Sequence, residues 1–363
     1  MNMTKALLVH YPDKYVAEEA LALAGAAGYE PVAELTQRYL DHARYGMGNG
    51  KAEEAASLVR EGEIGIILFD GTLNASQTYN LAKLCKVEVK DREKLILEIF
   101  AKRATTAEAK LQVELAELQY ELPRARDKVR KAKSGEQPGF FGLGKYEVDV
   151  YVRMMKKRMV TLKRKVDDVK KRRELLMTHR VRTGYPTVAL TGYTGAGKTT
   201  LFNRLTGESK EVNAGVFTTL SPTARGIDIG GRRVLFSDTV GFISRLPPFL
   251  IEAFKSTLEE VSYATVVLLL VDASEPLEKM ATSHLSCVRT LAELEVPEAR
   301  TLTVLNKVDL VGEEELGEKM RRAGLNETVG ISAMTGKGLA DLLHLIQERV
   351  SQSQEKGASV EVA

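Results

Sequence analysis

The sequence between residues 192 and 199 reads Gly192-Tyr193-Thr194-Gly195-Ala196-Gly197-Lys198-Thr199, which satisfies the pattern G-x-x-x-x-G-K-[ST]. A short β-branched run, 187–191, precedes it, and helix-forming residues 200–205 follow it. The glycines let backbone N–H groups converge on phosphate oxygens without Cβ clashes. The N-terminus of the following helix adds its positive dipole end. The stretch therefore predicts a phosphate-binding loop in an α/β domain, whereas a simple glycine-rich turn would not require the flanking strand and helix.

Each residue of this loop has an expected role at a bound nucleotide. Lys198 is expected to reach the β- and γ-phosphates as a catalytic residue, and the Thr199 hydroxyl is expected to ligate Mg²⁺. The remaining nucleotide contacts are expected from Gly192, Gly195, Ala196, Gly197 and Thr200. The loop thus supplies phosphate binding together with one metal ligand.

A second motif, Asp238-Thr239-Val240-Gly241, follows the predicted strand 234–237. Asp238 is expected to be a metal ligand at the Mg²⁺ site, and the Gly241 N–H is expected to contact the γ-phosphate. We count both as catalytic candidates. The pattern D-x-x-G is a weak signal alone, because many turns contain it. It gains weight here because it lies 40 positions after Lys198 and follows a strand of its own.

Base recognition is predicted at two further strand ends. The run Asn306-Lys307-Val308-Asp309 follows strand 301–305, and Ser332-Ala333 follows a short strand near Gly330. Asp309 can accept hydrogen bonds from guanine N1–H and the exocyclic amine, a donor pair that adenine lacks. We expect Asn306 to bond the base and the phosphate loop, Lys307 to cover the ring plane, and Ser332 and Ala333 to contact guanine O6. Because ligands bind at the carboxyl ends of strands in open α/β sheets, these motifs predict a GTPase domain with a doubly wound, mostly parallel sheet.

The γ-phosphate sensor and the hydrolytic apparatus have weaker signals in the sequence. Between the first helix of this domain and Asp238, the run Phe217-Thr218-Thr219-Leu220 is the candidate switch. We prefer Thr219 over Thr218 as a catalytic residue and Mg²⁺ ligand, with edge-strand threonines as the alternative. Many small GTPases carry a water-orienting Gln directly after D-x-x-G. Phe242 occupies that position here, which predicts slow intrinsic hydrolysis that a partner accelerates.

The rest of the chain predicts two further parts. Residues 1–90 alternate strands (6–9, 64–69, 87–89) with helices (about 13–27 and from about 75), as in a small α/β subdomain. Residues 91–183 hold two long periodic stretches, 91 to about 129 and 146–179, around a glycine-rich loop at 134–144, which predicts an antiparallel helical hairpin. The GTPase domain is expected over 184–351, and a polar tail over 352–363.

Charge is concentrated on the returning arm of this hairpin. Between Lys145 and Arg182 there are 14 basic and 5 acidic residues, a surplus of nine, whereas the whole chain carries a formal net charge of only +3. Such an arm is either a solvated helical face or a local surface for nucleic acid. The hairpin loop adds Phe140 and Phe141, which either stack on RNA bases or pack on the hairpin itself.

Several other features favour ordinary structural roles. The two cysteines, Cys85 and Cys287, lack metal-ligand spacing, and no apolar run is long enough to span a membrane. We therefore expect a cytoplasmic protein that does not enter a membrane, and we also expect a monomer. The five histidines share no metal spacing. The run Gly46-Met47-Gly48-Asn49-Gly50-Lys51 is one residue short of a phosphate loop, so we interpret it as a loop before a helix, with a nucleotide or RNA contact as the alternative.

The run Asp91-Arg92-Glu93-Lys94-Leu95-Ile96-Leu97-Glu98-Ile99-Phe100-Ala101 resembles the hallmark of HflX-type GTPases. The further matches are 110–116, Tyr120, 122–124, 192–194, 238–243, 246–247, 253–254 and 257–260. The resemblance, over about residues 5–350, implies an N-terminal α/β subdomain, a helical hairpin whose tip reaches toward the peptidyl-transferase centre, and a nucleotide domain. It also implies binding to the large ribosomal subunit and its rRNA, stimulation of GTP hydrolysis there, and, in some members, splitting of stalled ribosomes.

Two departures from the family pattern matter. Bacterial relatives usually carry Asn where this chain has Gly195, and in related GTPases that Asn helps hold a potassium ion, so K⁺ activation is in doubt. The loop with Phe140 and Phe141 looks more like archaeal members. We thus expect a ribosome-associated switch that uses Mg²⁺ and converts GTP to GDP. The alternatives are a signalling or scaffold GTPase whose hairpin binds a protein effector and, last, an ATP-driven RNA remodeller.

Overall fold

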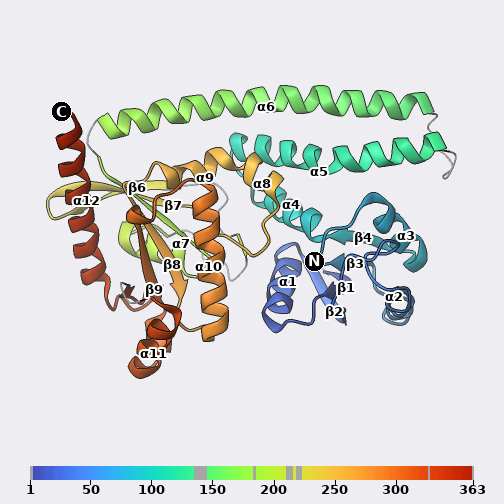
Figure 1. The fold of residues 1–363 in the computed structure, drawn as a ribbon, viewed down its shortest axis with the longest axis horizontal. Coiled ribbons are helices and arrows are strands. Elements are labelled where there is room, and N and C mark those ends of the chain that lie inside the picture. Colours follow the sequence, from blue (N-terminus) through green and yellow to red (C-terminus); the bar gives the residue numbers. More distant parts are fainter. Residues whose placement is uncertain are drawn as a thin grey trace. The chain divides into compact units, whose positions relative to one another are not determined.

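The computed structural model describes residues 3–134, 145–182, 185–209, 216–217, 223–325 and 328–361 (Figure 1). The predicted switch threonines Thr218 and Thr219 and the loop phenylalanines Phe140 and Phe141 lie outside the described residues. The chain forms two compact units, Met1–Asp168 and Val169–Ala363, which divide inside one long helix. The predicted domain borders at residues 90 and 183 therefore stay predictions.

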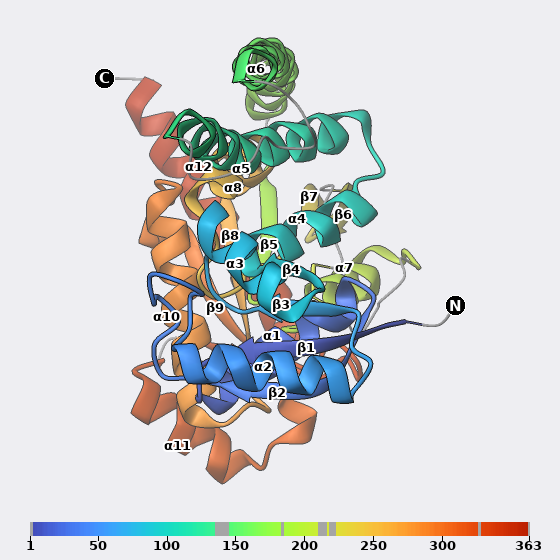
Figure 2. The same cartoon turned by 90° about the vertical axis from the view of Figure 1, so that its right-hand side faces the viewer.

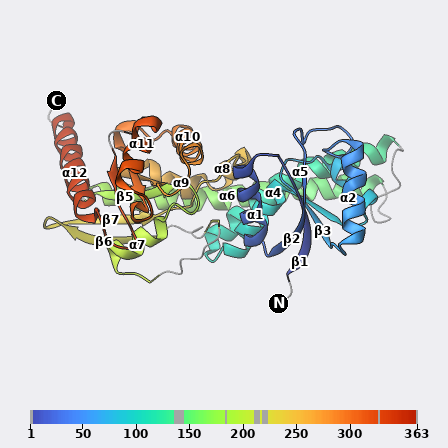
Figure 3. The same ribbon diagram turned by 90° about the horizontal axis from the view of Figure 1, so that it is seen from below.

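The first unit is built on a parallel sheet of four strands in the order β2-β1-β3-β4. The strands are β1 (Thr4–His10), β2 (Tyr29–Thr36), β3 (Ile66–Phe69) and β4 (Glu88–Asp91). The helices that connect them are α1 (Lys14–Ala26), α2 (Asn49–Glu61) and α3 (Ala75–Cys85). Figures 1 and 3 show the sheet between α1 on one side and α2 with α3 on the other. The predicted small α/β subdomain is confirmed.

Local sequence explains most of these elements. The Asp13 carboxylate caps α1 by accepting from the N–H groups of Tyr15 and Val16, the usual role of an aspartate directly before a helix. Helix α2 starts at Asn49, so residues 46–48 of the glycine-rich run precede the helix, as interpreted, whereas residues 49–51 belong to its first turn. Strand β2 escaped prediction because it is an edge strand: only one of its residues, Leu35, is buried, so it shows no apolar run.

The long helix predicted from residue 91 to about 129 is wrong at one place. It is two helices, α4 (Arg92–Arg103) and α5 (Ala107–Ser134), separated at Ala104, whose ψ of 94° is not helical. The Thr106 hydroxyl accepts the Ala109 N–H at 3.1 Å, so a new helix begins after this threonine. Threonine side chains offer the backbone such an alternative to a continuous helix, and the apolar spacing on either side does not reveal it.

The hairpin arms pair as predicted. Helix α5 runs beside the first part of α6 (Lys145–Arg182), as Figures 1 and 2 show. The seam is apolar at alternating spacings of three and four residues, the pattern of a coiled coil. It consists of Leu118, Leu122 and Ala125 on α5 and Val152, Met155 and Met159 on α6. Among the described side chains of α6, nine of the 14 basic residues are exposed, and one of these, Arg158, pairs with Glu114 of α5 at 2.6 Å.

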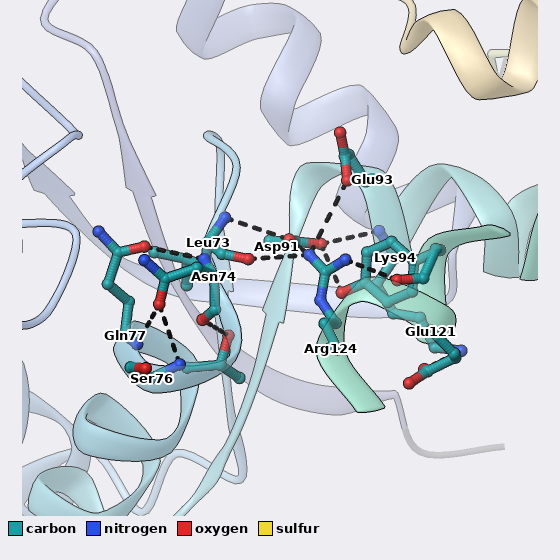
Figure 4. Close-up of polar contacts among 11 residues, drawn as sticks. Leu73, Asn74, Ser76, Gln77, Asp91, Glu93, Lys94, Glu121 and Arg124 are labelled. Carbon is teal, nitrogen blue, oxygen red and sulfur yellow. Dashed lines mark hydrogen bonds and ion pairs between the residues drawn. The ribbon is translucent and has the colours of Figure 1, made fainter. Parts of the chain in front are cut away.

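Asp91 ties α5 to the sheet of the first unit (Figure 4). Its carboxylate caps α4 at the Lys94 N–H and also accepts from the Leu73 N–H at 3.2 Å. From α5, the Tyr120 hydroxyl donates to it at 2.9 Å and the Arg124 guanidinium at 2.6 Å. Burial, followed by the charge of Asp91, raises the pKa of Tyr120, so that hydroxyl remains a donor. One buried carboxylate thus holds the base of the hairpin.

We expect Asp91→Asn to destabilise the first unit by about 2 kcal/mol, because the amide loses the charge that pairs with Arg124 and points a donor at other donors. The measurement is the denaturant midpoint of this unit, with hydrogen exchange at β4 as the probe of unfolding. The matched control is Glu54→Gln, which removes an exposed pair with Lys51 and should change stability by less than about 0.5 kcal/mol. Equal midpoints for the two variants would contradict the assignment.

The second unit is a six-stranded sheet in the order β10-β9-β8-β5-β7-β6, parallel except for β6. Its strands are β5 (Thr187–Gly192), β6 (Thr223–Ile229), β7 (Arg232–Asp238), β8 (Val266–Asp272), β9 (Thr301–Asn306) and β10 (Val329–Gly330). Its helices are α7 (Lys198–Thr206), α8 (Pro248–Ala253), α9 (Lys255–Ser262), α10 (Leu277–Glu293), α11 (Glu313–Ala323) and α12 (Leu339–Glu361), with 3₁₀ turns η2 (Glu298–Arg300) and η3 (Val308–Leu310).

The core of this unit lies on both faces of the sheet. Leu268 and Leu270 of β8 share one apolar cluster with Phe202 of α7 and Ile346 of α12. The alternate residue Leu269 points to the opposite face and is equally buried. A strand buried on both faces is typical of a doubly wound parallel sheet, which confirms the predicted fold class.

The predicted tail at 352–363 is wrong over most of its length, because α12 continues to Glu361. Its Gln, Glu, Lys and Ala residues favour a helix, and the single Gly357 does not end it. None of the helices in the described part of the chain is both long and apolar enough to cross a membrane.

Candidate nucleotide-binding site

The phosphate loop connects β5 to α7 and depends on glycine at two positions. Gly192 has φ +142°, and a Cβ there would lie 2.3 Å from the Leu270 carbonyl oxygen. Gly197 has φ +91°, and a Cβ there would lie 2.2 Å from Nδ2 of Asn306. Larger residues would clash with the neighbouring strand ends, so the glycines are required for packing as well as for access to the phosphates.

Lys198 lies at the first position of α7 and is buried. Its ammonium donates to the carbonyl oxygens of Gly192 at 2.9 Å and Tyr193 at 2.8 Å, so the side chain folds back along the loop. Burial lowers the pKa of Lys198 to about 8, although the nearby Asp238 carboxylate acts in the opposite direction. An ammonium removed from water in this way is poised to bind an anion, because phosphate would replace the lost solvation.

This lowered pKa predicts how nucleotide binding depends on pH. Below pH 8 Lys198 is already charged, whereas above pH 8 phosphate binding must take up a proton. We therefore expect the Kd for GDP to be flat from pH 7 to 8 and then to rise, approaching about tenfold per pH unit. In the absence of nucleotide, burial of the charged ammonium lowers the free energy of unfolding at every pH below 8. This destabilisation is lost as the pH rises from 8 toward 10.5, the ordinary pKa of lysine.

Titration of GDP affinity between pH 7 and 9.5 by calorimetry would test this expectation. Proton uptake should be visible as a dependence of the binding enthalpy on buffer ionisation. The matched control is Lys198→Arg, whose guanidinium stays charged across this range. An identical pH profile for the two proteins would contradict the role given to the lysine.

The predicted metal ligands meet beside Lys198. The Thr199 hydroxyl lies 3.2 Å from Oδ2 of Asp238, and both residues are buried. The Thr239 hydroxyl donates to the Leu190 carbonyl at 2.7 Å and so fixes the turn that carries Asp238. Hydroxyl and carboxylate oxygens suit Mg²⁺, which typically takes one or two protein ligands, with phosphates and water completing its shell. Within the described residues, no group of three or more His, Cys, Asp or Glu side chains could hold a metal by itself.

The segment after Asp238 runs along the phosphate loop. The Phe242 N–H donates to the Gly192 carbonyl at 3.0 Å, and the Thr194 N–H donates to the Phe242 carbonyl at 2.8 Å. The Phe242 ring is buried. At Gly241, a Cβ would lie 2.9 Å from Nζ of Lys198, which places this backbone against the ammonium.

Asn306 joins the phosphate loop to the predicted base-binding loops. Its amide donates to the Ala196 carbonyl at 2.8 Å and accepts the Ala333 N–H at 2.9 Å. Buried Ser332 precedes Ala333, and its hydroxyl accepts the Thr335 N–H at 3.0 Å. The Asn306 side chain thus connects the phosphate loop to the loop that carries Ser332 and Ala333.

The remaining base-recognition residues lie at the turn after β9. Lys307 adopts a left-handed conformation with φ +65°, and Asp309 is exposed in η3. Asp272, at the end of β8, pairs with the Lys307 ammonium at 2.5 Å. Asp272 was not among the predicted residues, although an acidic residue at the end of a buried strand is the same signal that identified Asp238.

The structure therefore brings together most of the predicted site. Lys198, Thr199, Asp238 and Gly241 form one cluster, and Asn306 links it to the base-recognition turns. Thr200 lies in the first turn of α7. At Gly195, φ is +84° and a Cβ would have no other atom within 4 Å, so the loop is open there.

Known GTPase families match most of this chain. Three protein families match successive parts of the chain: "GTP-binding GTPase N-terminal" over residues 14–101, "GTP-binding GTPase Middle Region" over 103–180 and "50S ribosome-binding GTPase" over 187–307. Proteins described as GTPase HflX are similar over most of the chain. The relative from Thermococcus kodakarensis is 41% identical, with 93% of this chain and 78% of that protein covered. The relative from Methanocaldococcus jannaschii is 46% identical, with 84% and 74% covered.

Solved structures show the same likeness. The crystal structure of a GTP-binding protein from Sulfolobus solfataricus in complex with GDP is 26% identical, with a TM-score of 0.51, and covers 96% of this chain and 99% of that one. The crystal structure of an SsGBP and GDP complex is 27% identical, with a TM-score of 0.56, and covers 97% and 99%.

Proposed function

This chain belongs to the HflX family of GTPases, and we propose that it acts as a nucleotide-controlled switch on the large ribosomal subunit. It is a GTPase that converts GTP to GDP and phosphate. The observation that carries the ribosomal proposal is the match of the nucleotide domain to a family described as 50S ribosome-binding. The curated relatives are themselves described only as GTPases.

The charge of the hairpin supports an RNA partner. Helix α6 exposes a run of basic side chains along its length, among them Lys156, Lys157, Lys163 and Arg164. A basic stripe along one helix is the electrostatic footprint of a nucleic-acid-binding surface. A partner that neutralises it by phosphate contacts would bind with strong salt dependence.

We assign the nucleotide contacts to the residues predicted from the sequence. Lys198 and the loop backbone would hold the phosphates, Thr199 and Asp238 would ligate Mg²⁺, and Asp309 would select guanine. The metal would neutralise charge on the β- and γ-phosphates. Thr219 is proposed to complete the metal site when GTP is bound.

The switch is proposed to operate through the γ-phosphate. GTP would order Thr219 and the segment 238–243, and hydrolysis would release both. Phe242, whose ring is buried, cannot orient the attacking water, so we propose that a partner supplies or positions that group. Intrinsic hydrolysis would then be slow, and the large subunit would accelerate it.

The test is the GTPase rate of the purified protein with and without large ribosomal subunits, together with co-sedimentation at several salt concentrations. We expect stimulation by the subunit and binding that weakens steeply with salt. The variant Lys163→Glu with Arg164→Glu should lose binding while its intrinsic GTPase rate is kept. The matched control is Arg321→Glu with Arg322→Glu, which makes the same charge change on exposed residues of α11. Binding that is absent, or indifferent to salt and nucleotide, would refute the proposal.

The same assay in potassium and in sodium tests the role of Gly195. Because this residue has no side chain to hold an ion beside the loop, we expect equal rates in the two salts. The variant Gly195→Asn has room for its side chain, and Asn tolerates the positive φ at this position. Stimulation of the unaltered protein by potassium would show that another group binds the ion.

The alternative is a GTPase whose hairpin binds a protein effector. It is favoured by exposed apolar residues on α6, where Tyr151 is 54% and Met154 is 64% exposed. This alternative predicts a protein partner that binds only with GTP, and no affinity for ribosomal subunits. The co-sedimentation experiment separates the two proposals.

A further inference from the structure

Tyr193 joins the phosphate loop to the segment that follows Asp238 by a side-chain hydrogen bond. Its hydroxyl accepts the backbone N–H of Ser244 at 2.8 Å. The two residues are 51 positions apart in the sequence, so this contact exists only in the folded domain. None of the roles assigned above to the phosphate loop uses the Tyr193 side chain.

This bond is the third in a short ladder. The first two are backbone bonds between Phe242 and the loop residues Gly192 and Thr194. Backbone bonds of this kind do not depend on residue type, whereas the bond to Ser244 requires the hydroxyl of Tyr193. The ladder holds residues 242–244 parallel to the loop, and the buried Phe242 ring anchors the same segment from the core side.

The ladder determines where Gly241 lies. This residue directly precedes Phe242, and its Cα region faces the Lys198 ammonium and the Thr194 side chain. Lys198 is the group expected to reach the β- and γ-phosphates. The ladder therefore holds the Gly241 backbone close to the position that a γ-phosphate would occupy.

We propose that Tyr193 is a positioning residue that couples the γ-phosphate-sensing segment to the phosphate loop, and so sets the preference for GTP over GDP. The proposal rests on the nucleotide site assigned above. GDP lacks the phosphate that Gly241 would contact, so the position of this segment matters little for GDP. GTP binds more tightly when this segment is already in place, because the backbone around Gly241 then loses less conformational entropy on binding.

The test compares Tyr193→Phe with the unaltered protein. The variant keeps the aromatic ring and removes only the hydroxyl that accepts from Ser244. One hydrogen bond is worth roughly a fivefold change in an equilibrium constant. We expect the Kd of a non-hydrolysable GTP analogue with Mg²⁺ to rise roughly fivefold, while the Kd of GDP changes less than about twofold. Single-turnover GTP hydrolysis at saturating GTP should slow, because Gly241 is held less firmly.

Tyr185→Phe is the matched control, because it removes the hydroxyl of an exposed tyrosine that precedes β5, at the opposite end of this strand from Tyr193. It should leave the ratio of the two affinities unchanged. Amide hydrogen exchange at residues 242–244 should become faster in Tyr193→Phe and stay unchanged in Tyr185→Phe. A loss that is equal for GDP and the GTP analogue would show a merely structural role and would overturn the proposal, as would no change in either affinity.

Lys198→Ala separates this proposal from the site assignment on which it rests. It should lose both GDP and the GTP analogue, because the phosphate loop would lack its cation. If Lys198→Ala retained GDP binding, the nucleotide site itself would be wrong and the proposal would fail with it. If Lys198→Ala loses both ligands and Tyr193→Phe changes neither, only the role of Tyr193 is refuted.

Discussion

Replacing Lys198 with alanine is expected to lower kcat for GTP hydrolysis by roughly 100- to 1,000-fold, the usual cost of removing one preorganised group that stabilises developing charge. The ammonium is buried beside Asp238 and Gly241, where water cannot substitute for it. In that low-dielectric position its interaction with phosphate is much stronger than at an exposed surface. GDP affinity should fall with it, because the lysine contacts the β-phosphate as well.

The measurement is steady-state phosphate release together with GDP titration. Lys337→Ala is the matched control, since it removes an exposed lysine from the same unit and should leave both quantities unchanged. Thermal unfolding without nucleotide checks that both variants keep the fold. Phosphate release by Lys198→Ala within a few fold of the unaltered rate would contradict the assignment of this loop.

The second large effect is expected at Asp309. We expect Asp309→Asn to weaken GTP by roughly 100-fold or more, because a site built to pair with the guanine donors is left mismatched. Xanthine carries an oxygen where guanine has its exocyclic amine, and the asparagine amide can donate to that oxygen. The variant should therefore bind xanthosine triphosphate better than GTP.

Competition between the two nucleotides for a fluorescent analogue would measure this exchange of preference. Asp341→Asn, on an exposed position of α12, makes the same chemical change away from the site and should keep the preference for GTP. Unchanged base preference in Asp309→Asn would assign guanine selection to other groups, with the backbone near Ala333 as the next candidate.

Sequence patterns were most informative where the requirement is local. The phosphate loop was predicted because glycine, lysine and threonine must occur at fixed spacing between a strand and a helix. The helical hairpin was likewise predicted from two stretches with helical periodicity, and its arms pair through an apolar seam. The fold class followed because each motif lies at the end of a strand.

The incorrect predictions arose where a local sequence pattern is compatible with two different structures. Apolar residues continue at helical spacing through residues 91–129, yet Thr106 starts a new helix by capping it. The polar end of the chain was interpreted as a tail, but its residues are also good helix formers and extend α12 to Glu361. Edge strand β2 exposes most of its side chains and so lacks the apolar run of a central strand.

By itself the sequence determined which groups bind a nucleotide, because their types and spacing follow from the chemistry of phosphate and guanine. Only the tertiary structure decided how those groups are connected. Asn306 bridges Ala196 and Ala333, Asp272 holds Lys307, and Tyr193 holds the backbone of Ser244. These bonds join residues far apart in the chain, and their geometry depends on the order of the strands in the sheet. The spacing of residues along the sequence does not reveal that order.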